Sequence, residues 1–450
     1  MHTEPITPIT PLLNGQGDGV YISTYGCQMN SNDSERMMSL LEMMNFRAVT
    51  SPEQASLIII NSCSIREKPV HKVHSEVGRY RKLKALNPLL KIGVAGCVAS
   101  QEKEQLRIDI PIIDFVLGTD SIDTLPEVVA KVRGGAKITQ TRFDRHEPYH
   151  IETMVRNPGV STFVNITKGC DNFCTFCVVP FTRGREKSRP LAHLITDVNK
   201  LVDRGVKEVT LLGQNVNSYE SDCGAGFSAL LEKLAVETGV ERIRFTTSHP
   251  KDFDDELIEV MAPHRAKVME YIHLPVQSGN SEILDRMNRG YTREEYISKV
   301  RAIFKAIPDA VLSTDIITGF PGETDAQFED TMSLLEEVPY ESLFAFSYSS
   351  RPMTKAAKYP DQVSEVVKSE RLNRLLARHR EIATDLATKY LGQTLDVLTE
   401  KYDSDKGQWQ GRSSQNKLVY FDGSVDLTGR TVKVKINEAM PFVMRGVALQ

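Results

Sequence analysis

Three cysteines lie close together near the middle of the chain, in the pattern Cys170-x-x-x-Cys174-x-x-Cys177. They follow a short apolar run, so one loop carries all three thiols, and thiolates at this spacing can converge on iron. Three protein ligands would leave one iron of a 4Fe–4S cluster open, where S-adenosylmethionine (SAM) could bind. The alternatives are a zinc site with a distant fourth ligand and three unreactive thiols. No CxxH and no second CxxC pair accompanies the loop, which favours iron–sulfur chemistry over structural zinc.

Three further cysteines are distinguished by their position relative to expected strands. Cys27, Cys63 and Cys97 each directly follow an apolar run that is typical of a buried strand. In an open parallel sheet the carboxyl ends of the strands share one edge, where ligand sites form. These thiols are therefore predicted to meet at a second cluster; the alternative is that each is a small buried hydrophobic residue. Cys223, in a polar stretch, is interpreted as a surface thiol outside both groups.

The composition indicates the class of protein that holds these groups. The chain has 450 residues with ordinary apolar and charged fractions, so two or three globular domains are expected. No apolar run approaches the roughly 20 residues of a membrane helix, and the polar N-terminus lacks the apolar core of an export signal. The sequence thus predicts a cytoplasmic protein with reduced cysteines. The formal net charge of −4 indicates no general affinity for polyanions, so RNA binding would require a local basic surface.

The first part of the chain, to about residue 148, alternates short apolar runs with longer amphipathic ones. This alternation is typical of βαβ units around a parallel sheet. Residues 1–17 are predicted to be a flexible tail, and 134–135 with 139–150 a linker. The expected strands are 20–25, 57–61, 92–95 and 115–117, and the expected helices are 33–45, 68–86 and 101–108.

The remainder divides into a second α/β part and a β-rich part. Residues 157–383 contain six strand–helix units, which predict a partial (β/α)6 barrel with active-site loops at the carboxyl strand ends. Residues 384–450 predict a small antiparallel β-barrel. The fold class is therefore α/β, with an N-terminal open parallel sheet domain over 18–148 followed by these two barrels. The expected strands are 163–166, 208–212, 243–246, 271–274, 311–317 and 343–348, then 395–399, 417–421, 431–436 and 442–448; the expected helices are 191–204, 281–307, 324–338 and 362–390.

The segments that carry the cysteines resemble the methylthiotransferase family of radical SAM enzymes, in particular its tRNA-modifying members. The resemblance covers nearly the whole chain after the tail, and the six cysteines match the two triads of the family one for one. The matching segments are TYGCQMN (24–30), NSCSIREK (61–68), AGCVAS (95–100), KGCDNFCTFCVVPFTRGREKSRP (168–190), LLGQNVNSY (211–219), TSHP (247–250), HLPVQSG (273–279) and TGFPGE (318–323).

This resemblance implies a methylthiotransferase domain, a radical SAM domain and a C-terminal TRAM domain, a small β-barrel that holds RNA. It implies two 4Fe–4S clusters and SAM as cofactors, one cluster cleaving SAM and the other carrying sulfur. The implied reaction adds a methylthio group to C2 of N6-isopentenyladenosine at position 37 of tRNA. The implied partners are the tRNA anticodon stem-loop, an electron donor such as flavodoxin or ferredoxin, and a sulfur donor. A monomer without membrane attachment is expected.

Other substrates and another class of protein remain open at this point. Within the family, threonylcarbamoyladenosine in tRNA and an aspartate of ribosomal protein S12 are alternative substrates. The segments TYGCQMN and VVPFTRG favour the isopentenyl branch, although no residue is assigned to the isopentenyl group. A non-catalytic RNA-binding protein with a structural metal is the alternative from a different class. The chain also reads YSSRPMTKAA over 348–357, where the family tends to read YSPRPGTPAA, a change that relaxes the backbone of this loop.

The candidate SAM contacts lie on or just after the expected barrel strands. Phe176, between two cluster cysteines, could pack near adenine or fill the core. Ile316 is placed on the adenine side. Backbone and polar groups after the other strands could bind the methionine or ribose of SAM, and no catalytic side chain beyond the cluster ligands is predicted. These groups are Gly213, Gln214, Asn215, Ser248, Gln277 and Ser278.

The candidate RNA contacts are basic residues in two places. Arg183, Arg185 and Arg189 follow the cysteine loop and could neutralise anticodon phosphates or be solvated. Arg412 and Lys417 lie in the last segment and could contact phosphates or bases, or be ordinary turn residues. A modified adenine would have to leave its stack to reach the barrel mouth.

Overall fold

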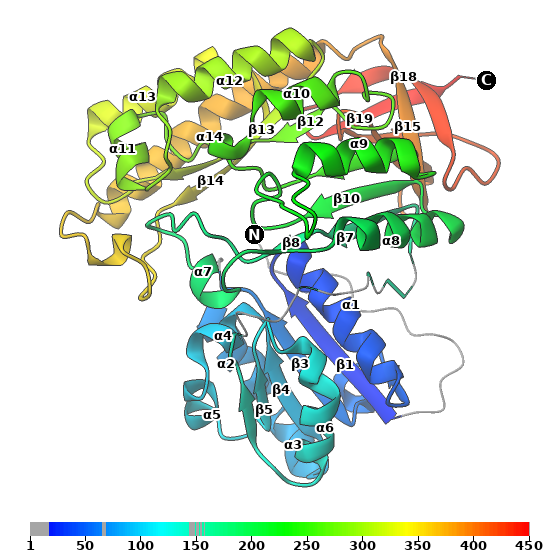
Figure 1. Cartoon of the computed structure of the whole chain (residues 1–450), viewed down its shortest axis with the longest axis vertical. Helices are drawn as coiled ribbons and strands as arrows, with labels where there is room; N and C mark the ends of the chain where they lie inside the picture. Colours follow the sequence, from blue (N-terminus) through cyan, green and yellow to red (C-terminus); the bar gives the residue numbers. More distant parts are fainter. Residues whose placement is uncertain are drawn as a thin grey trace. The chain divides into compact units, whose positions relative to one another are not determined.

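The computed structural model of the chain describes residues 18–64, 69–143, 149, 153, 155–156 and 158–449 (Figure 1). They fall into two compact units. The first comprises Met1–Asn157, Lys168–Asp171 and Cys177–Lys187, and the second comprises Pro158–Thr167, Asn172–Phe176 and Ser188–Gln450. The predicted tail 1–17 and much of the predicted linker lie outside the described residues.

The first unit is built on a six-stranded parallel sheet of order β2-β1-β3-β4-β5-β6. Every residue of β3 is buried, as expected for a parallel strand covered on both faces. The strand order reverses between β1 and β3, and a crevice forms at the carboxyl ends of strands at such a point. The strands are β1 (Asp18–Tyr25), β2 (Phe46–Ala48), β3 (Leu57–Ser62), β4 (Lys91–Ala95), β5 (Phe115–Leu117) and β6 (Ile138–Gln140).

Helices cover both faces of this sheet. Met37 and Leu41 pack on one face and Val73 and Val77 on the other, each within its own core cluster. Several elements differ from the expectation. The region 68–86 is two helices, β2 and the helix Leu125–Arg133 were not expected, and β6 forms at the predicted linker because β5 supplies its hydrogen bonds. The helices are α1 (Gln28–Glu42), α2 (Pro69–Arg79), α3 (Arg81–Leu86), α4 (Cys97–Glu102), α5 (Gln105–Asp109) and α6 (Leu125–Arg133).

The second unit contains the partial barrel. Its six strands pair in parallel as β11-β10-β7 and β12-β13-β14, with an isolated parallel bridge from Ile243 to Val268 between the two groups. The predicted six-stranded partial barrel is confirmed. The strands are β7 (Ser161–Asn165), β10 (Glu208–Leu212), β11 (Arg242–Phe245), β12 (Tyr271–His273), β13 (Val311–Thr318) and β14 (Tyr340–Ser347).

The helices of the partial barrel alternate with its strands. The region 281–307, expected as one helix, is two, because Asn288 and Gly290 adopt positive φ and Thr292 then caps α12 in a capping box with Glu295. The predicted limit at 383/384 falls inside α14. The helices are α8 (Leu191–Asp203), α9 (Phe227–Glu237), α10 (Asp255–Met261), α11 (Ser281–Arg286), α12 (Arg293–Ala306), α13 (Asp325–Glu337) and α14 (Glu365–Thr388).

A closed five-stranded barrel completes the second unit, in the order β15-β16-β17-β19-β18. The predicted small barrel is confirmed, with one difference: β17 and β19 pair in parallel, whereas the other neighbours are antiparallel. β16 was not expected, because its sequence QWQGRS is largely polar. The strands are β15 (Thr394–Asp403), β16 (Gln408–Ser413), β17 (Leu418–Phe421), β18 (Thr431–Ala439) and β19 (Val443–Ala448).

Buried charges join the closed barrel to the partial barrel. Arg242 donates to the carbonyls of Arg412 and Asp396 at 2.9 and 3.0 Å. Glu341 accepts from Lys417 Nζ at 2.7 Å and from the Tyr390 hydroxyl at 2.9 Å. Breaking a buried pair of this kind typically costs about 3–5 kcal/mol, so these contacts hold the closed barrel against the amino ends of β11 and β14.

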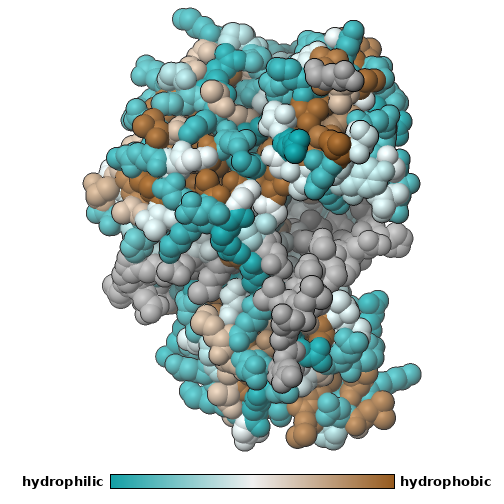
Figure 2. All heavy atoms as spheres, turned by 90° about the vertical axis from the view of Figure 1, so that its right-hand side faces the viewer, coloured by the Kyte–Doolittle hydropathy of each residue, from teal (hydrophilic) through white to brown (hydrophobic). Residues whose placement is uncertain are grey.

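The polarity of the surface and of the helices bears on membrane insertion. Hydrophilic residues predominate on the face drawn in Figure 2, and hydrophobic residues form small groups between them. Within the described ranges, none of the helices combines the length and apolar character needed to cross a membrane.

Candidate active site

The structure brings the three cysteines of the first unit together. Cys27 follows β1, Cys63 follows β3, and Cys97 begins α4 after β4. The side chain of Cys63 hydrogen-bonds with both Cys27 and Cys97. Cys63 and Cys97 are buried. The thiols therefore meet at the carboxyl edge of the sheet, beside the point where the strand order reverses.

Two glycines allow this convergence. Gly26 has a φ of +128°, and a Cβ at this position would lie 2.2 Å from the Cβ of Cys63. Gly96 has a φ of +89°, and a Cβ there would lie 2.3 Å from Asn61 Oδ1. No side chain fits at either position without moving a neighbouring strand end.

A buried arginine lies beside these thiols. The guanidinium of Arg183 donates to Asp33 Oδ2 at 2.8 Å and to Asn30 Oδ1 at 2.9 Å. The hydrogen bond from Cys63 lowers the pKa of Cys27 to about 6, with burial opposing it and the charge of Arg183 assisting. The same partners lower the pKa of Cys97 to about 7. Thiolates bind metals, so the site favours the ligand form of two cysteines.

Sequence reasoning missed a polar network beneath the thiols. Asn61 donates to the carbonyl of Asn30 at 2.7 Å and to Ser34 Oγ at 2.8 Å. Asn30 returns a hydrogen bond to Asn61 Oδ1 at 3.2 Å. These buried amides fix the start of α1 against β3. Asn30 and Asn61 lie within the segments TYGCQMN and NSCSIREK, so the signal was present in the sequence without an assigned role.

The donor set of the first unit suits a cluster with an open iron. Three thiols converge, and the other polar groups at the site are amides and an arginine–carboxylate pair, not a fourth thiol or imidazole. No group of three His, Cys, Asp or Glu side chains in the described part of the chain has the geometry of a single-ion site. The ligand roles of Cys27, Cys63 and Cys97 remain predictions.

The second cysteine group lies on the loop that follows β8 (Thr167–Lys168) and precedes α7 (Val179–Thr182). Cys170 and Cys177 group with the first unit, and Cys174 with the second. Cys174 is buried, and its sulfur accepts a hydrogen bond from Arg289 Nη1 at 3.3 Å. Arg289 also donates to the Pro275 carbonyl at 2.8 Å. Sequence reasoning missed this buried arginine, which places a positive charge on one candidate ligand.

Backbone contacts hold the same loop within the second unit. The Thr175 amide donates to the Met287 carbonyl, and the Thr175 carbonyl accepts from the amide of Ala356, both at 2.9 Å. Ala356 belongs to the stretch 348–357 that departs from the family. This stretch is thus tied to the cysteine loop despite the loss of a glycine and a proline.

The carboxyl ends of the barrel strands collect buried polar atoms that have no partner among the described residues. Ser248 and Asn215, two predicted SAM contacts, are among them, although the Asn215 amide nitrogen also donates to Asp252 at 2.6 Å. Burial lowers the pKa of His249 to about 2, so this ring is neutral. Unsatisfied buried polar groups are costly, and a polar ligand at the barrel mouth would satisfy them. The atoms are Thr167 Oγ1, Asn215 Oδ1, Ser248 Oγ, His249 Nε2 and Thr318 Oγ1.

Three other predicted SAM contacts lie at the same mouth. Gln277 adopts a φ of +76°, and its backbone pairs with Asp315 and Ile317. Such backbone strain in a residue other than glycine is typical of functional sites. A Cβ on Gly213 would lie 2.2 Å from Thr167 Oγ1, so the turn after β10 requires glycine. Gln214 follows it and is partly buried.

Three predicted contacts have their side chains engaged in packing. Ile316 is fully buried, so its side chain is part of the core. Ser278 is buried beside Thr331 and accepts from the amide of Asn280 at 3.3 Å. Phe176 packs against the core cluster that contains Phe320, which favours core filling over contact with adenine.

The predicted RNA contacts differ in their exposure. Arg189 is 2% exposed and pairs with Asp197 at 2.6 Å, Arg183 is buried beside Asp33, and Lys417 is buried against Glu341. These three basic side chains form ion pairs inside the protein. We therefore assign them structural roles in place of the predicted phosphate contacts. Arg185 and Arg412 remain candidates, because their side chains are 59% and 39% exposed. Cys223 is exposed, as predicted.

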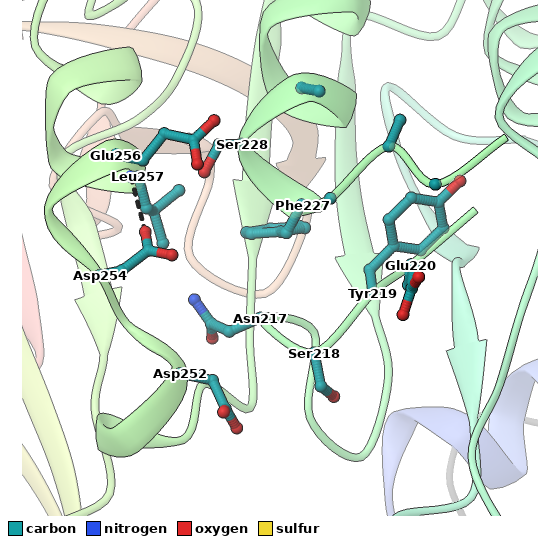
Figure 3. A pocket seen from close by; sticks show the side chains of 14 residues that line it. Asn217, Ser218, Tyr219, Glu220, Phe227, Ser228, Asp252, Asp254, Glu256 and Leu257 are labelled. Atoms are coloured by element: carbon teal, nitrogen blue, oxygen red, sulfur yellow. Dashed lines mark hydrogen bonds between the residues drawn. The ribbon is translucent and has the colours of Figure 1, made fainter.

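A cavity of about 510 Å³ lies beside the loop after β10 and the start of α9 (Figure 3). Its lining includes four carboxylates, and Asp254 Oδ1 caps α10 by accepting from Leu257 N at 2.9 Å. The negative charge makes this cavity unsuited to phosphate. The carboxylates are Glu220, Asp252, Asp254 and Glu256.

Comparisons with known proteins agree with this architecture. Residues 164–335 match the radical SAM superfamily, 19–118 match a family described as "Uncharacterized protein family UPF0004", and 388–449 match the TRAM domain. Among solved structures, the chain resembles the radical SAM methyltransferase TsrM from Kitasatospora setae, with a TM-score of 0.57 at 14% identity over 76% of this chain and 77% of that one. This likeness shows the fold alone. The chain is therefore a radical SAM protein with a TRAM barrel.

Similar proteins of known name define the family of this radical SAM protein more narrowly. The chain is 63% identical over 433 residues to the tRNA-2-methylthio-N(6)-dimethylallyladenosine synthase of Bdellovibrio bacteriovorus, covering 96% of both chains. It is 43% identical to the protein of the same name from Moorella thermoacetica, over 94% of this chain and 97% of that one. The chain belongs to the family of tRNA-2-methylthio-N(6)-dimethylallyladenosine synthases.

Proposed function

We propose that the chain is a transferase that adds a methylthio group to C2 of N6-isopentenyladenosine at position 37 of tRNA. The observation that carries the proposal is the convergence of Cys27, Cys63 and Cys97 in a chain whose separate cysteine loop adjoins a radical SAM barrel. The relatives named for this reaction support the substrate.

The residues of the chain would hold two 4Fe–4S clusters and SAM. Cys170, Cys174 and Cys177 would bind one cluster, and Cys27, Cys63 and Cys97 the other. When bound, these groups supply one-electron cleavage of SAM and a carrier for sulfur. The polar atoms of Asn215 and Ser248, with the backbone around Gly213 and Gln277, would orient SAM at the barrel mouth.

The three parts of the chain would divide the work. Residues 18–148 would carry sulfur, 157–383 would bind SAM, and 384–450 would hold tRNA, with Arg185 and Arg412 contacting phosphates. An electron donor such as flavodoxin or ferredoxin and a separate sulfur donor would complete the reaction. We place the enzyme in the cytoplasm, since its tRNA substrate is found there, and we propose that it acts as a monomer.

Mass spectrometry of tRNA nucleosides from a strain lacking the gene tests the reaction. We expect the 2-methylthio-N6-isopentenyl nucleoside to disappear and the isopentenyl nucleoside to accumulate. An unchanged pool would contradict the proposal, and loss of the methylthio group from threonylcarbamoyladenosine or from ribosomal protein S12 would assign the alternative substrate.

A cysteine substitution tests the ligand roles. Cys27→Ala should lower the iron content from about eight to about four per chain and abolish methylthiolation, while 5′-deoxyadenosine still forms from SAM. Cys223→Ala, at an exposed thiol, is the matched control and should change neither quantity. Zinc in place of iron in the wild-type chain would favour the non-catalytic alternative.

A further inference from the structure

Toward their carboxyl ends, the strands β12, β13 and β14 have one face that is more exposed than the other among the described residues, and we call it the uncovered face. Side chains alternate between the faces of a sheet, and register partners point the same way. Leu312, Thr314 and Ile316 are fully buried on the other face, where Ser347 Oγ donates to the carbonyl of Lys368 on α14. The uncovered face carries the alternate residues of the same strands.

Two phenylalanines stand on this uncovered face. Phe344 is 51% exposed and Phe346 is 55% exposed. Their register partners on β13 are Asp315 and Ile317. Exposing two aromatic rings on one face of a strand forfeits part of the stabilisation that their burial would give. A ligand that covers the rings would recover it.

Polar groups adjoin the rings. The ring of His273 meets that of Phe344 edge to face, with centroids 6.0 Å apart. His273 Nε2 lies 3.5 Å from Asp315 Oδ1, and its Nδ1 lies 2.7 Å from Ser313 Oγ. The face thus combines aromatic surface with hydrogen-bonding groups, which is the chemistry that recognises an unstacked base.

The same face reaches the cysteine loop. Ile317, the register partner of Phe346, packs against the small core cluster that contains Phe320 and Tyr348. Phe176, which lies between Cys174 and Cys177, packs against that cluster as well. A base on the two phenylalanines would therefore lie close to the loop at which SAM would be cleaved.

We infer that Phe344 and Phe346 form the surface that receives the isopentenyl-bearing adenine, and that they select the isopentenylated base over unmodified adenine. The inference rests on the proposed function and names residues for its substrate specificity. The dimethylallyl tail is apolar, and it needs an apolar surface next to the base. His273 and Asp315 offer hydrogen-bonding groups to the base edge.

The test uses the reconstituted full chain and two synthetic anticodon stem-loops, one isopentenylated and one with unmodified adenine. We expect Phe344→Ala and Phe346→Ala to lower the ratio of kcat/KM for the isopentenylated over the unmodified RNA by about tenfold each. Only the isopentenylated RNA carries the dimethylallyl tail, and apolar contact with such a group is worth a factor of this order. Phe346→Leu, which keeps an apolar side chain, should retain more of the ratio. Leu376→Ala, at an exposed apolar side chain on α14, should leave the ratio unchanged.

Each other outcome overturns the inference in a recognisable way. An unchanged ratio in both alanine variants would show that the rings do not select the substrate. Loss of 5′-deoxyadenosine formation without RNA would assign the face to SAM, and a lower melting temperature with an unchanged ratio would assign the rings to protein packing. If the wild-type chain modifies neither RNA, the proposed function itself fails; if it prefers the isopentenylated RNA and the variants do too, only the inference fails.

Discussion

The two cysteine groups of this protein are assembled in different ways. Cys170, Cys174 and Cys177 are neighbours in the chain, and one loop carries them. Cys27, Cys63 and Cys97 are separated by whole βα units and meet only because a parallel sheet aligns the ends of β1, β3 and β4. The first arrangement depends on local spacing, whereas the second depends on close contact between distant strand ends.

Each group has a buried arginine, but the charges are balanced differently. Arg183, beside Cys27 and Cys97, is paired with the carboxylate of Asp33. Arg289, beside Cys174, donates to the hydroxyl of Tyr291, the carbonyl of Pro275 and the sulfur. The positive charge of Arg289 is therefore available to an anionic ligand on its loop, while that of Arg183 is largely neutralised. This difference suits the proposed roles, in which the loop would meet SAM and the sheet edge would carry sulfur.

The largest effect is expected from a substitution that disrupts the convergence of the three cysteines at the sheet edge. Gly26→Ala forces a Cβ into Cys63 at a positive φ, so we expect loss of the cluster of the first unit, about half of the iron and all methylthiolation. SAM cleavage should persist, because the cysteine loop is not altered. Iron analysis and product assays check this result. The control is Gly78→Ala on α2, where a Cβ meets nothing within 4 Å; full activity in Gly26→Ala would refute the argument.

A smaller effect is expected at the cysteine loop. Arg289→Met removes a charged hydrogen bond to Cys174, and such bonds are worth about 1.5–3 kcal/mol. We expect 5′-deoxyadenosine formation to fall roughly tenfold while the cluster of the first unit is retained. Arg286→Met, which removes a partly exposed pair with Asp361 and a contact with the Tyr359 ring, should change the rate little. Equal rates in the two variants would show that Arg289 does not serve this site.

The smallest effect is expected at the exposed arginine past the loop. Arg185 pairs with Asp171 at the surface. We expect Arg185→Ala to weaken tRNA binding by a few fold and to reduce the slope of log binding constant against log salt concentration by about one. Binding titrations at several salt concentrations measure both quantities. Arg185→Lys should keep the salt dependence. A loss of affinity without a change in salt dependence would exclude a phosphate contact.

Much of the fold could be predicted from the sequence because its signals are local. The strands of the parallel sheet and of the partial barrel are short apolar runs, and their positions agree with the structure to within a few residues. The missed strands include β2, β6 and β16, which are short or largely polar and form because β1, β5 and β15 supply hydrogen bonds to them. The division of 281–307 into two helices was also missed, although Gly290 and the capping residue Thr292 were visible.

The candidate site could be predicted less completely. Local spacing sufficed to propose the group Cys170, Cys174 and Cys177, whereas the group Cys27, Cys63 and Cys97 was proposed from strand-end placement and the family resemblance. The same strand-end rule placed the SAM candidates at the barrel mouth. The sequence could not distinguish the arginines that are buried from those that are exposed. Arg183, Arg185 and Arg189 are alike in sequence, yet two are buried in ion pairs and one is exposed. Lys417 is likewise turned into a buried pair with Glu341.

The sequence by itself determined the two cysteine groups, the order of the domains and the chemistry that the thiols can perform, because these depend on residue type and on spacing along the chain. Only the tertiary structure decided which basic side chains are available to RNA, which polar atoms at the barrel mouth lack partners, and that two phenylalanines share an uncovered face. These properties depend on burial and on contacts between distant segments. A charged group in a buried ion pair is closed to a ligand, whereas one that is paired at the surface, such as Arg185 with Asp171, stays accessible.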